Sequence, residues 1–288
     1  MQNNYQGYRL LLVHAHPDDE TINNGATIAM YADLGAEITL VTCTRGEEGE
    51  VLIKELQHLI ASQTNTLGAY RVQELAAAMK ELGVTDHRFL GEGMRIYRDS
   101  GMSGSETNKN TEVFCQADIE LASDDLVKVI DEVKPHVLIT YDEFGGYGHP
   151  DHIQTHKVTM RATEKSKWKI PKIYWNVIPK SILQNGIETW RNEGLNFQSV
   201  EKVEDFPFAK EDSYVDAIVD ATPYAERKKM AMLAHATQIS VDGRFFALSD
   251  DIGVKIFGVE YYTLIKGIKS APFNNNNQEL DLFAGIKL

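Results

Sequence analysis

The sequence predicts an α/β fold: a Rossmann-like, mostly parallel sheet flanked by helices, with a smaller C-terminal α/β portion. An apolar strand-type segment at 8–14, a helical pattern at 22–34 and a second strand-type segment at 37–43 follow one another. This is the order of a βαβ unit, which implies parallel strands with a right-handed crossover. Strand and helix patterns continue to alternate along the chain, so we expect later strands to extend the same kind of sheet.

Capping and breaking signals bound the predicted helices. Gly35 follows helix 22–34 and Gly83 follows helix 67–82, because glycine adopts the left-handed conformation that ends helices. Helix 119–133 begins after Asp118. The other predicted elements are strands at 88–90, 136–142, 172–178, 215–219 and 261–265, helices at 153–165 and 223–236, a long Gly-rich loop at 91–110 and a mobile polar segment at 274–277.

A change in composition at 168–171 divides the predicted chain in two. Residues 1–170 form the Rossmann-like catalytic domain with the metal site, and residues 171–288 form a C-terminal portion that completes the substrate pocket. The hydrophobic content of 43% over 288 residues is sufficient for a packed core.

Charge and composition restrict the partners. The formal net charge of -13 argues against nucleic acid or an anionic membrane, and favours a neutral or cationic small molecule. A basic and apolar leader is absent, and no run approaches the ~18 apolar residues of a membrane span, so we expect a cytoplasmic protein. Cys43 and Cys115 lack CxxC spacing and form no disulfide framework. The oligomeric state stays open, and a homo-oligomer is compatible with these features.

Two histidine-containing segments follow predicted strands. The first is HPDDE at 16–20, and the second is GHPDH at 148–152. The carboxyl ends of strands in an open parallel sheet form the ligand crevice, so segments far apart in sequence can face one another there. The first of these turns lacks the GxGxxG loop of dinucleotide-binding folds, so we do not expect it to bind phosphates.

The residue types in these segments predict a metal centre. Imidazole nitrogen and carboxylate oxygen suit Zn²⁺, and a catalytic site takes three protein ligands and leaves one position for water. We expect His16, Asp19 and His152 to bind Zn²⁺, with Fe²⁺ or another divalent ion as alternatives. Asp18 is then free to accept a proton from that water. The alternative is a turn with an Asp N-cap that opens a helix, but the second motif favours the metal site.

Further candidates lie in loops at the same edge of the sheet. Glu47 or Glu50 lines the pocket mouth and accepts substrate hydroxyls, or else belongs to a solvated acidic loop. Tyr147 stands in a Gly-rich loop, whose flexibility would let its ring swing over a bound substrate. His235 points at the pocket from the C-terminal portion. The remaining histidines without a partner motif are interpreted as structural: His58, His87 and His136.

Together, the two motifs resemble the paired signature of the PIG-L/LmbE-like metal-dependent N-deacetylases. Within that family the chain is most similar to the branch that deacetylates N-acetylglucosaminyl-inositol in mycothiol biosynthesis. The resemblance covers most of the chain in the same order, through 41–44 with 46–51, 67–68 with 70–71, 98–102, 140–142 with 145–147, 234–238 and 247–249.

The resemblance implies roles for individual residues. It implies His16, Asp19 and His152 as zinc ligands, Asp18 as the general base, Tyr147, His149 and Asp151 as further catalytic residues, and Arg71 and Asp99 as contacts to sugar or inositol hydroxyls. We expect a cationic His149, with its pKa raised by Asp151, to stabilise the oxyanion together with the Tyr147 hydroxyl. Protonation of the leaving amine falls to Asp18 or His149.

The sequence therefore predicts a metal-dependent amide hydrolase that removes acetate from an N-acetylglucosaminyl conjugate of the GlcNAc-inositol type. The alternatives within the family are a mycothiol S-conjugate amidase and a deacetylase of another GlcNAc derivative, such as GlcNAc-malate or a chitooligosaccharide. Gly148 and Asn23 favour the deacetylase over the amidase. A non-catalytic metal- or sugar-binding module has no use for Asp18 beside the ligands, and an NAD-dependent oxidoreductase would need the missing glycine loop.

Overall fold

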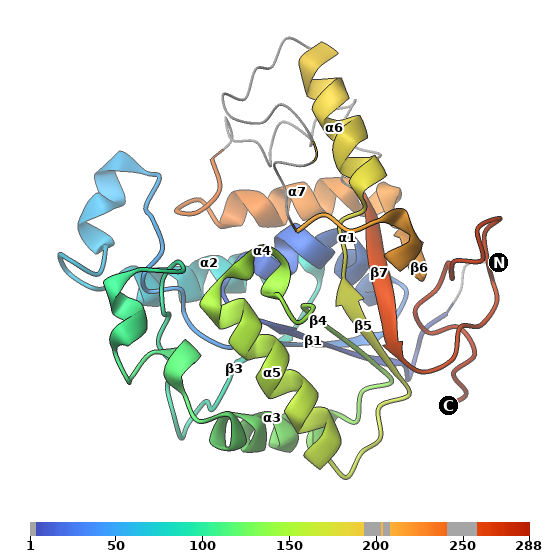
Figure 1. Cartoon of the computed structure of the whole chain (residues 1–288), viewed down its shortest axis with the longest axis horizontal. Coiled ribbons are helices and arrows are strands. Elements are labelled where there is room, and N and C mark those ends of the chain that lie inside the picture. The colour runs from blue at the N-terminus through green and yellow to red at the C-terminus, as the bar shows by residue number, and fades with distance from the viewer. Residues whose placement is uncertain (1–3, 193–202, 204–207, 241–257) are drawn as a thin grey trace.

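A seven-stranded sheet in the order β3-β2-β1-β4-β5-β7-β6 organises the chain (Figure 1). The computed structural model describes residues 4–192, 203, 208–240 and 258–288, so the similarity at 247–249 lies outside the described residues. The strands are β1 (Arg9–His14), β2 (Glu37–Thr42), β3 (Asp86–Phe89), β4 (Val137–Thr140), β5 (Lys172–Asn176), β6 (Ala217–Asp220) and β7 (Val259–Lys266). The first five are parallel, and β7 is antiparallel to both its neighbours. The predicted mostly parallel α/β fold is confirmed.

Helices cover both faces of this sheet (Figure 1). One face packs against α1 (Asp19–Asp33), α2 (Leu67–Leu82) and α7 (Ala225–Ala234), and the other against α3 (Ile119–Val133) and α5 (Pro150–Lys165). Leu10 and Leu12 of β1 face the first layer, whereas Leu11 and Val13 face the second. A strand buried on both faces needs a continuous apolar run, which explains the sequence of β1.

The described residues contain two further α-helices and several 3₁₀ segments. They are α4 (Gly145–Gly148), α6 (Lys180–Asn192) and the 3₁₀ segments η1 (Lys54–Leu59), η2 (Glu106–Lys109), η3 (Phe114–Gln116), η5 (Asp212–Tyr214) and η6 (Thr222–Tyr224). The sequence did not predict α6, because Gly186 interrupts its helical pattern. Within the described part of the chain, no helix has the length and apolar character needed to cross a bilayer.

Local signals set the ends of α2 and α3. Gly83 ends α2 in the left-handed conformation, at φ 80°. The Asp118 side chain accepts hydrogen bonds from the N–H groups of Glu120 and Leu121 at the start of α3. Both helices have the bounds that the sequence predicted.

The C-terminal strands extend the same sheet. β5 pairs with β4 across the division expected at 170/171, and β7 pairs with β5. Glu279 is fully buried and ties the end of the chain to β5, because it accepts from Lys172 Nζ at 2.5 Å and from the Tyr174 hydroxyl at 2.7 Å. The segment 274–277, which we expected to be mobile, forms a turn. Asn274 Oδ1 accepts from the Gln278 N–H at 3.0 Å, which closes a turn next to this anchor.

The long loop at 91–110 is folded by its own side chains. The carbonyl of Ser100 accepts from Thr107 Oγ1 at 2.7 Å, Asn108 Nδ2 at 2.6 Å and Ser105 Oγ at 3.3 Å. Compact loops of this kind pack around their own polar groups. The loop therefore holds Ser100 in a defined position at the carboxyl edge of the sheet.

Candidate active site

The candidate site lies where the order of the strands reverses. β1 and β4 are neighbours, and the chain continues from them into helices on opposite faces of the sheet (Figure 1). Such a switch point opens a crevice at the carboxyl ends of the strands. The segment 16–20 follows β1 and opens α1, and the segment 148–152 follows β4 and opens α5. The fold therefore brings together the two motifs that the sequence analysis singled out.

Three of the predicted ligand atoms form a small triangle. His16 Nδ1 lies 3.4 Å and His152 Nε2 lies 3.3 Å from Asp19 Oδ2, and the two nitrogens are 3.3 Å apart. All three side chains are buried. In a tetrahedral site with zinc–ligand distances of about 2.0–2.1 Å, neighbouring ligands lie about 3.3–3.4 Å from one another. The triangle has the size of one face of such a tetrahedron, so these residues fit a divalent ion.

Hydrogen bonds on the outer nitrogens orient both imidazole rings. His152 Nδ1 lies 3.1 Å from the Gly145 carbonyl, which can only accept, so Nδ1 donates and Nε2 presents its lone pair to the triangle. His16 Nε2 lies 3.2 Å from Asp151 Oδ2, which leaves the Nδ1 lone pair for the triangle. Tyr141 stacks on His152 with ring centroids 4.3 Å apart. Outer partners of this kind fix the tautomer of metal-binding histidines.

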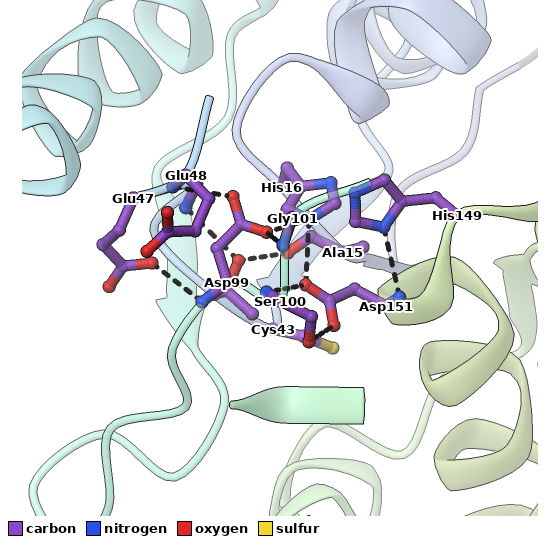
Figure 2. Close-up of polar contacts among 12 residues, drawn as sticks. Ala15, His16, Cys43, Glu47, Glu48, Asp99, Ser100, Gly101, His149 and Asp151 are labelled. Atoms are coloured by element: carbon purple, nitrogen blue, oxygen red, sulfur yellow. Dashed lines mark hydrogen bonds and ion pairs between the residues drawn. The ribbon is translucent and has the colours of Figure 1, made fainter. Parts of the chain in front are cut away.

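Asp151 is held in turn by Ser100 (Figure 2). The Ser100 N–H donates to Asp151 Oδ2 at 2.9 Å, and its hydroxyl donates to Oδ1. His16, Asp99 and Asp151 also form a second set of potential metal donors, and His16, His149 and His152 form a third, which shares two histidines with the triangle. The N–H groups of Glu48 and Gly101 already bind the Asp99 carboxylate, as Ser100 binds Asp151. Main-chain N–H groups thus hold both carboxylates of the second set, as the His16 N–H holds Asp19 Oδ2 of the triangle at 2.9 Å.

Asp18 stands at the start of α1 but does not cap it, since its side chain makes no cap hydrogen bond. The turn opens α1, as the alternative interpretation expected, but without a cap from the Asp18 side chain. Its φ of 112° is uncommon for a residue with a side chain and occurs mainly at functional sites. Arg71 donates to Asp18 Oδ2 at 3.2 Å and to the Pro17 carbonyl. Burial raises the pKa of Asp18 to about 6, with the Arg71 charge acting in the opposite direction.

His149 is not the cation that the sequence led us to expect. Positions two apart at a helix start do not face each other, and the Asp151 carboxylate turns to His16 instead. Burial lowers the pKa of His149 to about 3. His149 Nδ1 accepts the Asp151 N–H at 3.1 Å, so the neutral ring carries its proton on Nε2. Its ring lies edge-on to that of His16, with centroids 4.6 Å apart (Figure 2).

Tyr147 lies over the site on the glycine-rich turn α4. Its side chain is 52% exposed, and its ring centroid lies 4.9 Å from that of His152. Gly146 and Gly148 have φ of 68° and 91°, which side-chain-bearing residues rarely adopt, so the turn requires these glycines. Although the residue as a whole is half-exposed, desolvation around the phenol oxygen raises the pKa of Tyr147, and the hydroxyl remains a hydrogen-bond donor at neutral pH.

The residues predicted to contact substrate are buried beside the triangle. Arg71 NH1 donates to the Gly46 carbonyl at 2.9 Å. Asp99 lies 3.5 Å from His16 Nε2, and its N–H donates to Glu47 Oε2 at 3.0 Å (Figure 2). Glu47 is only 9% exposed, so it does not belong to a solvated acidic surface.

Sequence reasoning gave no role to several residues that shape this site. Ser100 and Tyr141 stood within the segments that carry the family resemblance, which was the only signal for them. Glu20 belongs to the first motif, and its carboxylate accepts from His235 Nε2 at 3.0 Å. His235, which we expected to point at the pocket, is fully buried and turns its Nε2 to Glu20.

Comparisons with known proteins agree with this geometry. Residues 11–163 match the PIG-L family, described as GlcNAc-PI de-N-acetylase. A protein of Acidothermus cellulolyticus named 1D-myo-inositol 2-acetamido-2-deoxy-alpha-D-glucopyranoside deacetylase is 52% identical over 279 residues, covering 96% of this chain and 94% of the relative. A protein of the same name from Streptomyces avermitilis is 50% identical over 291 residues, covering 96% and 97%.

Solved structures show the same fold at lower identity. N,N'-diacetylchitobiose deacetylase from Pyrococcus horikoshii has a TM-score of 0.55 at 22% identity, covering 90% of this chain and 84% of that chain. GalB, the 4-carboxy-2-hydroxymuconate hydratase from Pseudomonas putida, has a TM-score of 0.59 at 18% identity, covering 93% and 100%. The family match spans more than half of the chain and the relatives span nearly all of it, so the chain belongs to the PIG-L family.

Proposed function

We propose that the protein removes acetate from an N-acetylglucosaminyl-inositol conjugate by hydrolysis of the amide bond. The observation that carries the proposal is the triangle of His16, Asp19 and His152. The Asp18 carboxylate stands beside it and is not one of its three ligands. Relatives at about half identity over nearly the full length are named as deacetylases of 1D-myo-inositol 2-acetamido-2-deoxy-alpha-D-glucopyranoside. Their names support this substrate class.

His16, Asp19 and His152 would hold the cation, which we propose to be Zn²⁺; Fe²⁺ or another divalent ion suits the same donors. When bound, the cation lowers the pKa of water from about 15.7 to about 7 and polarises the amide carbonyl. The Asp151 bond to His16 and the Gly145 carbonyl bond to His152 support this role, because they keep both ligand nitrogens deprotonated and aligned.

Asp18 is the proposed general base. It accepts a proton from the attacking water as the oxygen bonds to the acetamide carbon, and its pKa of about 6 leaves it ionised at neutral pH. The Arg71 guanidinium holds the carboxylate in place. Asp18 then returns the proton to the nitrogen as the C–N bond breaks, which yields acetate and a free amine.

His149 and Tyr147 are the proposed donors to the oxyanion. His149 is neutral with its proton on Nε2, so it donates a hydrogen bond rather than a full proton. The Tyr147 hydroxyl supplies a second donor from the turn above the triangle. Donors fixed in advance at the point where charge develops stabilise the transition state more than the substrate. We assign Asp151 the orientation of His16.

Arg71, Asp99 and Glu47 remain the proposed contacts to the hydroxyls of the sugar or inositol. Each is buried next to the triangle, and the Arg71 Nε has no hydrogen-bond partner among the described residues. An unpaired buried donor is costly, and a substrate oxygen would satisfy it. We propose that the C-terminal portion, 171–288, completes the pocket around the small-molecule amino sugar.

A kinetic panel tests the substrate. One Zn²⁺-loaded preparation is assayed for amine release from GlcNAc-inositol, GlcNAc-malate, chitobiose and a mycothiol S-conjugate. We expect the highest kcat/KM for GlcNAc-inositol, and a higher value for any other compound would replace it as the proposed substrate. Removing the ion with a chelator should abolish amine release, and adding Zn²⁺ should restore it. Activity that survives complete metal removal would contradict the proposed function.

A further inference from the structure

Asp18 has a backbone conformation that the surrounding chain must impose. Its φ of 112° and ψ of -32° lie in a region that residues with a side chain rarely adopt. Such conformations persist only where several contacts fix them. Arg71 provides one set of contacts, to the Pro17 carbonyl and the Asp18 carboxylate. The other set comes from Glu20 and His235.

Glu20 and His235 form a buried pair that reaches the Asp18 peptide. Glu20 Oε2 accepts the Asp18 N–H at 3.1 Å. Glu20 Oε1 accepts from His235 Nε2 at 3.0 Å and from the Thr21 hydroxyl at 2.6 Å. Neither Glu20 nor His235 has exposed surface. The position of the peptide that carries Asp18 therefore depends on a carboxylate that His235 holds.

His235 lies in a well-anchored turn that follows α7. Its carbonyl accepts from the N–H groups of Gln238 and Ile239, each at 2.9 Å. Thr237 donates to the buried Glu74 of α2 twice, from its N–H at 2.8 Å and its hydroxyl at 2.7 Å. The turn is thus tied to the helix that also carries Arg71. Helix α2 therefore supports both sets of contacts on Asp18, the one from Arg71 and the one from Glu20 and His235.

We propose that His235 is a positioning residue for the catalytic turn, acting through Glu20 on the Asp18 peptide. The inference rests on the proposed function, because it takes Asp18 as the base. A displacement of about 1 Å at a reacting group can cost about 100-fold in rate, so loss of the contact should lower kcat. If the pair served only folding, its loss would lower the free energy of unfolding and leave the kcat of the folded protein unchanged.

Two amide variants separate positioning from folding. In His235→Gln the side-chain nitrogen takes the place of the histidine Nε2 and can donate to Glu20. In His235→Asn the side-chain nitrogen lies near the former Nδ1 position and does not reach Glu20. We expect kcat for amine release to fall about 10- to 100-fold in His235→Asn, with KM nearly unchanged, and to recover in His235→Gln. Equal kcat in the two variants would overturn the inference.

A matched control and a double-mutant cycle locate the effect. His136→Asn replaces another buried imidazole, which precedes β4 at the end of the strand away from the site and accepts the Arg9 N–H at 3.0 Å, and we expect it to leave kcat unchanged. In an Asp18→Ala background, His235→Asn should cause no further loss of kcat, because the two residues then act as one unit. A full additional loss in that background would contradict positioning through Asp18.

Amide exchange tests the contact without substrate. The Asp18 N–H, bound to Glu20 in the folded chain, should exchange with solvent faster in His235→Asn than in His235→Gln, as measured by NMR on the metal-loaded full chain. If the unchanged protein released no amine, the proposed function would fail, while the exchange rates would still decide the role of His235. Unchanged exchange in His235→Asn alongside intact amine release would overturn the positioning role alone.

Discussion

The substitution Asp151→Asn tests how strongly the outer hydrogen bond of His16 supports metal binding. The Asp151 carboxylate accepts from His16 Nε2 at 3.2 Å, from the Ser100 N–H at 2.9 Å and from the Ser100 hydroxyl. The asparagine amide has the same shape but only one acceptor oxygen. We expect this oxygen to face His16 and the Ser100 N–H, because both can only donate there, and the NH₂ group to face the hydroxyl.

The substitution removes the negative charge next to the ligand imidazole. The His16 ring then becomes a weaker base and a weaker ligand. Loss of an outer partner of this kind costs about 10- to 100-fold in metal affinity, which corresponds to about 1.4–2.8 kcal/mol. The Ser100 hydroxyl oxygen already accepts the Cys115 N–H at 2.9 Å. In Asp151→Asn it would also accept from the Asn NH₂ group, and its own proton would then have no acceptor. We therefore expect the upper half of that range.

Competition with a chromophoric chelator at neutral pH measures the Zn²⁺ dissociation constant of each variant. Asp131→Asn is the matched control, because Asp131 Oδ1 accepts the Ser166 hydroxyl at 2.5 Å and the Trp168 N–H at 3.1 Å in a similar arrangement on α3. We expect the control to bind Zn²⁺ like the unchanged protein. Equal Zn²⁺ affinity in Asp151→Asn and Asp131→Asn would refute the assignment of Asp151 to His16.

Three further predictions follow from the same contacts. Ser100→Ala removes the hydroxyl donor to Asp151 but keeps the N–H donor, so its loss of Zn²⁺ affinity in the chelator competition should be smaller than that of Asp151→Asn. Asp18 must be ionised to accept a proton, and burial raises its pKa to about 6 while a bound cation lowers it. We therefore expect kcat to fall at pH values below about 6, and a kcat that rose on acidification would contradict this role. Phe283→Ala removes a buried ring that packs against Tyr31 with centroids 5.0 Å apart, and it should lower the free energy of unfolding by about 3–5 kcal/mol in urea titrations. An unchanged unfolding midpoint would show that the C-terminal residues add nothing to the core.

Elements with strong local signals were predictable from the sequence. The bounds of α2 and α3 agree with the prediction because Gly83 and Asp118 act on their own backbone, within a few residues. The turn at 274–277 was not predicted, for the opposite reason. The turn lies next to Glu279, whose partner Lys172 is 107 residues away, so the polar composition of the segment alone gave no signal for it.

The sequence by itself determined the α/β fold and nominated the candidate ligands His16, Asp19 and His152, because strand ends and ligand chemistry can be read locally. Only the tertiary structure decided which partner each of the other side chains of the site contacts. Asp151 meets His16 across 135 residues rather than its neighbour His149, and His235 meets Glu20 across 215. Side-chain direction at a helix start depends on what packs against that helix, and those partners come from distant parts of the chain.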